Sequence, residues 1–225
     1  MGVVICVDPS DAEPIIAELK HRNWKLDYIF NTHHHYDHTD GNGDLKKATG
    51  AKVIGCEKDK LRIPYIDIAV TAGEILEYAG CEVLPLYGHT TGHIGFYFPQ
   101  DKALFCGDVL FSLGCGRVFE GTYEQAYNSL QIIAKLPPDT RIYCGHEYTR
   151  MNSGFALKYE PNNPNLREYC ENMKEPTIPT TVKLERKTNP FLRCDSVEIR
   201  YNLGLDETAS KLEVFTELRK KRNVF

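Results

Sequence analysis

The sequence lacks any apolar run of about 18 residues, the length that a helix needs to cross a bilayer. It also lacks a basic start followed by a long apolar segment, which is the pattern of a secretion signal. Its 27 Lys and Arg against 31 Asp and Glu leave a formal charge of -4, so no strong excess of one sign favours nucleic acid or a membrane as partner. A composition of 42% hydrophobic and 26% charged residues is instead ordinary for a soluble globular protein.

The sequence also lacks closely spaced cysteines of the CxxC type. The eight cysteines are scattered, and none of them forms a CxxC pair. A disulfide framework is typical of a much smaller secreted chain, so reduced and mostly buried thiols are the better interpretation. We therefore expect a cytoplasmic protein, with a disulfide-bonded extracellular protein as the alternative, and we take a monomer as its expected assembly.

Short apolar runs alternate with amphipathic stretches in the first part of the chain. The runs that predict strands are Val3–Val7, Tyr28–Phe30, Lys52–Cys56, Glu74–Tyr78, Cys81–Tyr87, Ile94–Phe98, Ala103–Cys106 and Arg141–Cys144. The stretches that predict helices are Asp11–His21, Leu45–Thr49 and Tyr123–Lys135. After His146, turn-rich pieces separate helical patterns, the longest of which is Asp206–Arg222. The sequence thus predicts an α/β domain over residues 1–147 and a small helical domain over residues 148–225.

A cluster of metal-ligand residue types follows the second predicted strand. Four imidazoles and one carboxylate stand within six residues, in the segment Thr32-His33-His34-His35-Tyr36-Asp37-His38. Neutral imidazole and carboxylate are ligands that zinc and similar divalent ions take. Because side chains alternate along an extended chain, His33 and His35 should point one way and His34 the other. A tight turn after Tyr36 can then bring Asp37 and His38 to a second ion.

Three further residues share one sequence context. His89, Asp108 and His146 each follow an apolar run and one glycine, where a strand gives way to a loop. Taken singly, such a histidine is more typical of a hydrogen-bonded loop, and such an aspartate of a helix cap. Four strand ends that meet at one edge would, however, supply seven ligands, too many for one tetrahedral zinc but suitable for two ions that share a carboxylate. We therefore predict two divalent metal ions, with zinc expected and iron or manganese as alternatives.

Neighbouring residues have plainer interpretations. We expect His34 to face away from the ions, and His93 to orient a ligand or to cap the following turn. Cys106 and Cys144 each precede a ligand by two residues, but both lie in apolar strands and are expected to be core thiols.

The histidine cluster carries the HxHxDH signature of the metallo-β-lactamase superfamily, and within it the chain resembles the glyoxalase II (hydroxyacylglutathione hydrolase) family. The other matching segments are Gly88–His93, Cys106–Phe111, Gly114–Arg117, Glu120–Thr122, Cys144–Thr149, Glu160–Pro164 and Thr188–Arg193. The resemblance implies a metallo-β-lactamase αββα sandwich followed by a helical domain that helps to bind glutathione. Family members usually have a strand hairpin before the segment that matches Val3–Pro9, so we expect an incomplete chain or a misplaced start.

The resemblance also implies roles for individual residues. It places His33, His35 and His89 on one metal ion. It places Asp37, His38 and His146 on the other, with Asp108 as the bridge between them. Asp37, His38 and Asp108 are the residues that it implies hold the attacking hydroxide.

The same resemblance implies that a second group of residues binds the glutathione moiety. These substrate-binding residues are Arg117, Phe119, Tyr148, Arg219 and Arg222. Phe119 stands where some members have a tyrosine, so one hydrogen bond to the peptide is missing. Without the resemblance, the basic run at residues 219–222 is typical of the solvated last turn of a helix. With it, Arg219 and Arg222 lie on one helix face and can bind a carboxylate.

The implied activity is hydrolysis of S-D-lactoylglutathione and related 2-hydroxyacyl glutathione thioesters, a step of methylglyoxal detoxification. A water between two cations has its pKa lowered from about 15.7 towards 7, so hydroxide is available at neutral pH. A thiol pKa near 8.5 lets the glutathione thiolate leave without a strong proton donor. The alternatives are another enzyme on this scaffold, such as a persulfide dioxygenase, a lactonase or a β-lactamase, and a metal-binding module without catalysis.

Overall fold

The structure is a computed structural model that describes residues 2–225. The chain forms two compact units. The first unit consists of the residues up to Pro85 together with Thr90–Asp101, and the second consists of Leu86–His89 together with Lys102–Phe225. Each unit contains strands and helices, and each is described separately below.

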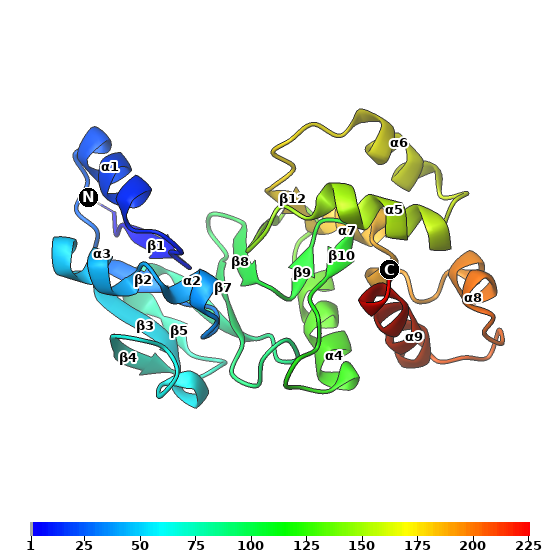
Figure 1. Cartoon of the computed structure of the whole chain (residues 1–225), viewed down its shortest axis with the longest axis horizontal. Helices are drawn as coiled ribbons and strands as arrows, with labels where there is room; N and C mark the ends of the chain where they lie inside the picture. The colour runs from blue at the N-terminus through cyan, green and yellow to red at the C-terminus, as the bar shows by residue number, and fades with distance from the viewer. Residues whose placement is uncertain (1) are drawn as a thin grey trace. The chain divides into compact units, whose positions relative to one another are not determined.

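A four-stranded parallel sheet lies at the centre of the first unit (Figure 1). Its strands are ordered β1 (Ile5–Val7), β2 (Tyr28–Phe30), β3 (Lys52–Cys56) and β4 (Ile66–Val70). Helices α1 (Glu13–Arg22) and α3 (Asn42–Thr49) connect successive strands, and their apolar side chains Leu19 and Leu45 are buried in one core with Ile29 and Val53 of the sheet. Because the strands are parallel, the chain leaves β1 and β2 at the same edge.

A second, antiparallel group of strands completes the first unit. It contains β5 (Ile75–Leu76), β6 (Cys81–Pro85) and β7 (Ile94–Phe98). The ring of Phe30 on β2 packs against Phe96 on β7 with centroids 4.5 Å apart. The backbone N–H of Ile94 also donates to Thr32 O at 2.9 Å, so β7 holds the start of the histidine segment.

The second unit is built on three strands and a small hairpin. Strand β8 (Ala103–Gly107) pairs in parallel with β11 (Arg141–Cys144), which pairs antiparallel with β12 (Thr180–Thr181). The hairpin consists of β9 (Leu110–Phe111) and β10 (Gly114–Cys115).

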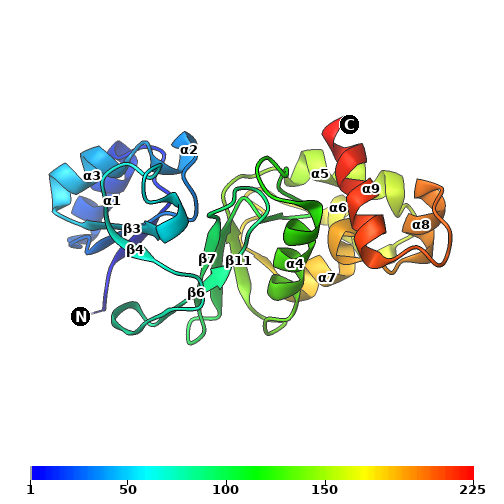
Figure 2. The same ribbon diagram turned by 90° about the horizontal axis from the view of Figure 1, so that it is seen from below.

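Helices make up most of the rest of the second unit. They are α4 (Tyr123–Ala134), α5 (Thr149–Tyr159), α6 (Pro164–Asn172), α7 (Val182–Thr188), α8 (Val197–Leu203) and α9 (Lys211–Asn223). Helix α9 lies beside α4 (Figure 2), and a cluster of the buried rings Phe155, Phe191 and Phe215 joins the helices. Within residues 2–225, no helix is both long and apolar enough to span a bilayer.

Most of the predicted strands and helices are present in the structure. The strands at Tyr28–Phe30, Lys52–Cys56, Ile94–Phe98 and Arg141–Cys144 have the predicted bounds, and α4 ends one residue before the prediction. Helix α4 is well defined because Thr122 and Gln125 form a capping box at its start.

Several predictions were wrong in their bounds. Strand β1 begins two residues later than predicted, and β6 ends two residues earlier. Only Ile75–Leu76 of the strand predicted at Glu74–Tyr78 is extended, because a 3-10 turn at Glu77–Ala79 leads into Gly80 in the left-handed conformation. The last helix begins at Lys211 rather than Asp206, since Ser210 caps it by accepting from Glu213 N. Helix α3 begins three residues earlier than predicted, at Asn42.

Candidate functional site

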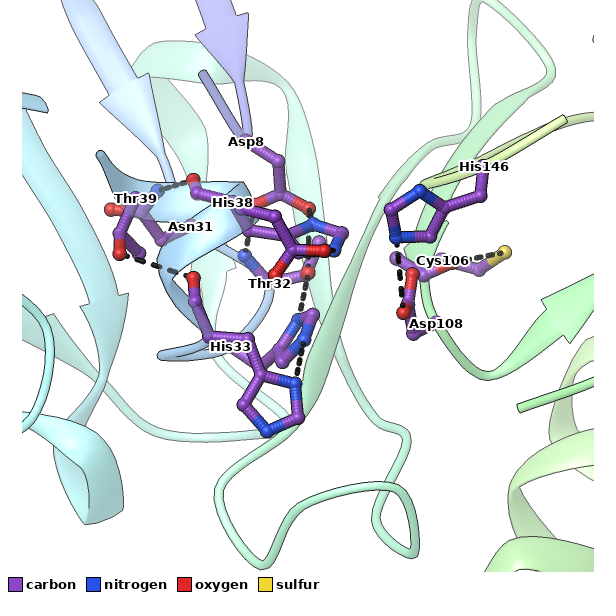
Figure 3. Close-up of polar contacts among 12 residues, drawn as sticks. Asp8, Asn31, Thr32, His33, His38, Thr39, Cys106, Asp108 and His146 are labelled. Carbon is purple, nitrogen blue, oxygen red and sulfur yellow. Dashed lines mark hydrogen bonds and ion pairs between the residues drawn. The ribbon is translucent and has the colours of Figure 1, made fainter. Parts of the chain in front are cut away.

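In the first unit, Asp8 organises the histidine segment (Figure 3). This carboxylate follows β1, and its Oδ1 accepts from Thr32 N at 2.7 Å. Its Oδ2 accepts from Thr32 Oγ1 at 2.7 Å and lies 3.0 Å from His38 Nδ1. Thr32, His33 and His38 are all nearly inaccessible to solvent. The carboxylate therefore acts in a buried environment, where its hydrogen bonds decide which ring nitrogens carry protons.

These hydrogen bonds leave Nε2 of both His33 and His38 as an acceptor. Because the Asp8 carboxylate only accepts, His38 Nδ1 must carry a proton. The Thr32 hydroxyl donates its single proton to Asp8, so at 3.0 Å it accepts from His33 Nδ1. In the neutral rings, Nε2 of both histidines then presents a lone pair, which is the state that binds a metal ion.

His33 and His35 converge as predicted. His33 Nε2 lies 3.0 Å from His35 Nδ1. Two nitrogens on one tetrahedral zinc are separated by about 3.3 Å, given zinc–nitrogen bonds of about 2.05 Å. The spacing of the two nitrogens therefore fits a shared cation.

The predicted turn after Tyr36 is a single helical turn, α2 (Tyr36–Thr39). It carries Asp37 and His38, and Asp37 Oδ2 lies 3.8 Å from His38 Nε2. A carboxylate oxygen and a ring lone pair are both acceptors, so a cation placed between them would stabilise this arrangement.

His34 points to a different partner. Its Nδ1 lies 3.1 Å from Oδ2 of the fully buried Asp59, whose Oδ1 accepts from Arg62. His93 stacks on His33, with ring centroids 4.7 Å apart, and so contacts a predicted ligand.

The second unit brings together His89, Asp108 and His146. Asp108 Oδ2 lies 3.7 Å from His89 Nε2 and 3.4 Å from His146 Nε2 (Figure 3 shows the His146 pair). His89 Nδ1 donates to the carbonyl of Arg117 at 2.8 Å, so its Nε2 presents a lone pair to the carboxylate. One carboxylate oxygen facing two imidazole nitrogens is the arrangement expected of a metal-bridging aspartate.

The backbone before His89 requires a glycine. Gly88 has φ +134°, and a Cβ built there would lie 2.7 Å from the Ala126 backbone in α4. The chain turns sharply against α4 at this point, and this turn sets the position of His89.

The predicted substrate residues all lie in the second unit, and three of them are at its surface. Phe119 is 58% exposed and Tyr148 is 39% exposed. The Tyr148 ring stacks on His146 with centroids 4.9 Å apart, next to a predicted ligand. The guanidinium of the exposed Arg117 lies 5.8 Å from the Phe119 ring centroid.

Arg219 and Arg222 differ in their environments. Arg219 is only 4% exposed, and its Nη1 donates to Cys115 O at 2.6 Å. Its predicted contact with substrate stays a prediction. In the structure, Arg219 holds the backbone of β10 through this hydrogen bond. Arg222 is half-buried, and burial together with the positive charges of Arg219 and Arg117 lowers its pKa. These neighbouring cations produce a positive local potential.

The eight cysteines are free thiols. Burial raises the pKa of Cys144 to about 12 and holds that of the fully buried Cys106 well above its usual range. Both are therefore protonated core thiols at neutral pH, in line with their expected role.

Sequence reasoning missed Asp8 and Asp59. Asp8 follows an apolar strand, as the predicted ligands do. Because Pro9 and Ser10 come next, however, the sequence pattern indicates only a simple turn. Asp59 lies in the charged segment Glu57–Lys60, where no pattern distinguishes it from solvated neighbours.

We expect the variant Asp8→Asn to weaken metal binding by roughly 10- to 100-fold. Its amide nitrogen would donate to His38 Nδ1, which moves the ring proton to Nε2 and blocks that ligand. Metal affinity measured by competition with a chelator tests this expectation. The exposed Asp11→Asn serves as control, and an Asp8→Asn protein with unchanged affinity would contradict the role of Asp8 in setting the tautomer.

Comparison with known proteins covers the whole chain. The family model of the metallo-β-lactamase superfamily matches residues 4–146, and that of the hydroxyacylglutathione hydrolase C-terminus matches residues 147–225. Hydroxyacylglutathione hydrolase from Methylococcus capsulatus is 46% identical over 100% of this chain and 90% of that protein. The protein of the same name from Pelagibacter ubique is 48% identical over 94% of this chain and 88% of its own length.

Solved structures resemble the chain in fold. TTHA1623 in a di-iron-bound form has a TM-score of 0.62 and 27% identity, over 84% of this chain and 89% of that one. ETHE1 from Myxococcus xanthus has a TM-score of 0.67 and 23% identity, over 97% of this chain and 80% of that one. Together with the family models, these matches confirm the predicted metallo-β-lactamase fold followed by a helical C-terminal region.

Proposed function

Because the chain belongs to the hydroxyacylglutathione hydrolase family of the metallo-β-lactamase superfamily, we propose that it hydrolyses S-D-lactoylglutathione and related 2-hydroxyacyl glutathione thioesters. The products are glutathione and the hydroxy acid. The observation that carries this proposal is the match of residues 147–225 to the C-terminal model of that family, in addition to the scaffold match. The proposal places the chain in methylglyoxal detoxification.

We propose that seven side chains hold two divalent ions. His33, His35 and His89 would bind one ion, Asp37, His38 and His146 the other, and Asp108 would bridge them. The lone pairs that face each other within each unit support this assignment. The di-iron form of TTHA1623, at 27% identity, supports a dinuclear centre. Zinc is the proposed metal, and iron or manganese also suit imidazole and carboxylate donors.

The ions, when bound, would polarise the thioester carbonyl and make hydroxide available at neutral pH. Asp8 fixes the tautomers of His33 and His38, so that both rings present Nε2 lone pairs. The Arg117 carbonyl does the same for His89 by accepting from its Nδ1.

The predicted substrate residues would bind the glutathione part of the thioester, and the chemistry of the thiol explains how it leaves. The cations of Arg117 and Arg222 would attract the carboxylates of glutathione, and Tyr148 offers a hydroxyl and a ring beside His146. A thiol with a pKa of about 8.5 leaves as thiolate at neutral pH, so the chain needs no acid residue at the leaving group.

We also propose a division of labour along the chain. Residues 1–147 would form the catalytic domain and residues 148–225 the glutathione-binding domain. Every proposed ligand and substrate residue comes from one chain, which is compatible with a monomer. The buried thiols Cys106 and Cys194 suit the reducing cytoplasm.

The test combines metal analysis with turnover on one preparation. We expect about two equivalents of divalent metal per chain and hydrolysis of S-D-lactoylglutathione that is lost with a chelator and restored by zinc. A folded, metal-replete protein that leaves the thioester intact would contradict the proposal. Consumption of oxygen with glutathione persulfide would favour the dioxygenase instead.

A further inference from the structure

A short segment of the second unit connects the predicted metal ligand Asp108 with the predicted substrate residue Arg117. We call residues 109–117 the hairpin segment, because they contain β9 and β10. Four buried side chains from α5, α7, the end of α7 and α9 hydrogen-bond to its backbone. These are Asn152 to Ser112 O at 3.0 Å, Glu185 to Leu113 N at 3.0 Å, Asn189 to Gly114 O at 2.9 Å and Arg219 to Cys115 O at 2.6 Å.

Glu185 has the central position among these contacts. Its Oε2 accepts from Leu113 N and from Asn189 Nδ2, and its Oε1 accepts from Thr180 Oγ1 at 2.6 Å. Leu113 has φ +60°, a left-handed conformation that is unfavourable for a non-glycine residue. The hydrogen bond from its amide to Glu185 stabilises this strained turn.

Glu185 is inaccessible to solvent, and its contacts oppose the cost of burying it. Burial raises its pKa, while the donors Thr180, Asn189 and Leu113 N act to lower it. The Glu185 carboxylate is expensive to remove, because the Leu113 N–H and the Thr180 hydroxyl would lose their acceptor in a buried environment.

The far end of the hairpin segment contacts the metal-ligand residues of the same unit. Gly116 N donates to Val109 O at 3.1 Å, and a Cβ at Gly116 would lie 1.8 Å from the carbonyl oxygen of Asp108. The carbonyl of Arg117 accepts from His89 Nδ1 at 2.8 Å. A displacement of the hairpin segment therefore moves the backbone of Asp108 and the hydrogen bond that sets the tautomer of His89.

We propose that Glu185 is a positioning residue that holds His89 and Asp108 in ligand geometry through the hairpin segment. Among the contacts described for residues 2–225, those of Glu185 include none of the predicted metal ligands, so it acts at a distance, by fixing the turn at Leu113. This inference rests on the proposed function in one respect, since it takes His89 and Asp108 as metal ligands.

The test measures binding of cobalt(II) by the metal-free protein, together with the visible absorption of the cobalt complex. We expect Glu185→Ala to weaken binding roughly ten-fold and to change the absorption spectrum, because ligand geometry changes. Glu185→Gln should stay close to the native protein. Its amide oxygen can accept from Leu113 N and Asn189, while its NH2 group donates to the Thr180 hydroxyl. If Glu185→Ala does not fold, Glu185→Asp shortens the same side chain by one methylene and tests the same contact.

Glu160 provides a matched control in the same unit. It is also a buried glutamate, 2% exposed, and accepts from Arg193 Nε at 2.7 Å and Asn163 Nδ2 at 2.8 Å. Glu160→Ala should lower the melting temperature and leave cobalt affinity and spectrum unchanged.

Two results would overturn the positioning role. One is a folded Glu185→Ala or Glu185→Asp protein with native cobalt affinity and spectrum. The other is an equal loss of affinity in Glu160→Ala, which would mean that both residues act through general stability. In either case, native protein that binds two metals and hydrolyses the thioester leaves the proposed function standing.

Discussion

Replacing Asp108 with asparagine is expected to abolish tight binding of the second metal ion and to lower kcat/KM by roughly 10³-fold or more, which is about 4 kcal/mol of transition-state stabilisation. The reason is electrostatic. One oxygen of this carboxylate faces both His89 Nε2, at 3.7 Å, and His146 Nε2, at 3.4 Å. An amide has nearly the same size but no negative charge, so it cannot neutralise two cations.

The measurements for Asp108→Asn are metal equivalents per chain, thioester hydrolysis and thermal unfolding. Asp139→Asn is the matched control, because this exposed aspartate of the same unit pairs only with Lys102 among the interactions described. We expect the control to keep both metals and full activity. An Asp108→Asn protein that still holds two ions and turns over at the native rate would refute the bridging role.

Much of the fold could be predicted from the sequence because local patterns determine it. Strands such as Lys52–Cys56 are short apolar runs bounded by turns, and α4 has both an apolar face and a capping box. Errors arose where a single residue decides where an element begins or ends. Gly80, in the left-handed conformation, ends the 3-10 turn that follows β5, and Ser210 caps the start of α9. Strand β4 (Ile66–Val70) escaped prediction, although Ile66 and Ile68 alternate with polar and small residues.

The residues of the candidate site also fall into those that the sequence could predict and those that it could not. From residue type and spacing alone, the histidines and aspartates at strand ends could be predicted to lie close together within each unit, and their role as metal ligands stays a prediction. The residues that orient them could not, because their partners are distant in sequence: Asp8 is 24 residues from Thr32 and 30 from His38, and Glu185 is 72 from Leu113. A carboxylate on the surface and one that sets a histidine tautomer look identical in a sequence, and only the fold distinguishes them.

Removing two cations, in the double variant Arg117→Ala with Arg222→Ala, is expected to raise KM for the glutathione thioester roughly 100-fold or more and to change kcat little. Each charge-assisted hydrogen bond to a carboxylate contributes about 1.5–3 kcal/mol, and groups that bind ground state and transition state equally affect KM. Burial, together with the nearby charges of Arg219 and Arg117, lowers the pKa of Arg222, and a bound carboxylate would offset the positive charges. Steady-state kinetics with S-D-lactoylglutathione and with a small thioester that lacks the peptide carboxylates measure the effect.

The comparison between the two substrates decides what the basic residues do. KM for the small thioester should stay unchanged in the double variant, because that substrate has no carboxylate to lose. Lys220→Ala with Lys221→Ala is the matched control. It removes two positive charges from the exposed side of the same helix, where Lys220 contacts Glu217. A contrary result would be a control that raises KM for the glutathione thioester as much as the arginine variant does. That result would mean that the positive charge at the end of α9 acts at long range, and that Arg117 and Arg222 do not contact the substrate carboxylates directly. Equal changes on both substrates would place Arg117 and Arg222 outside the glutathione site, since only a peptide contact discriminates between them.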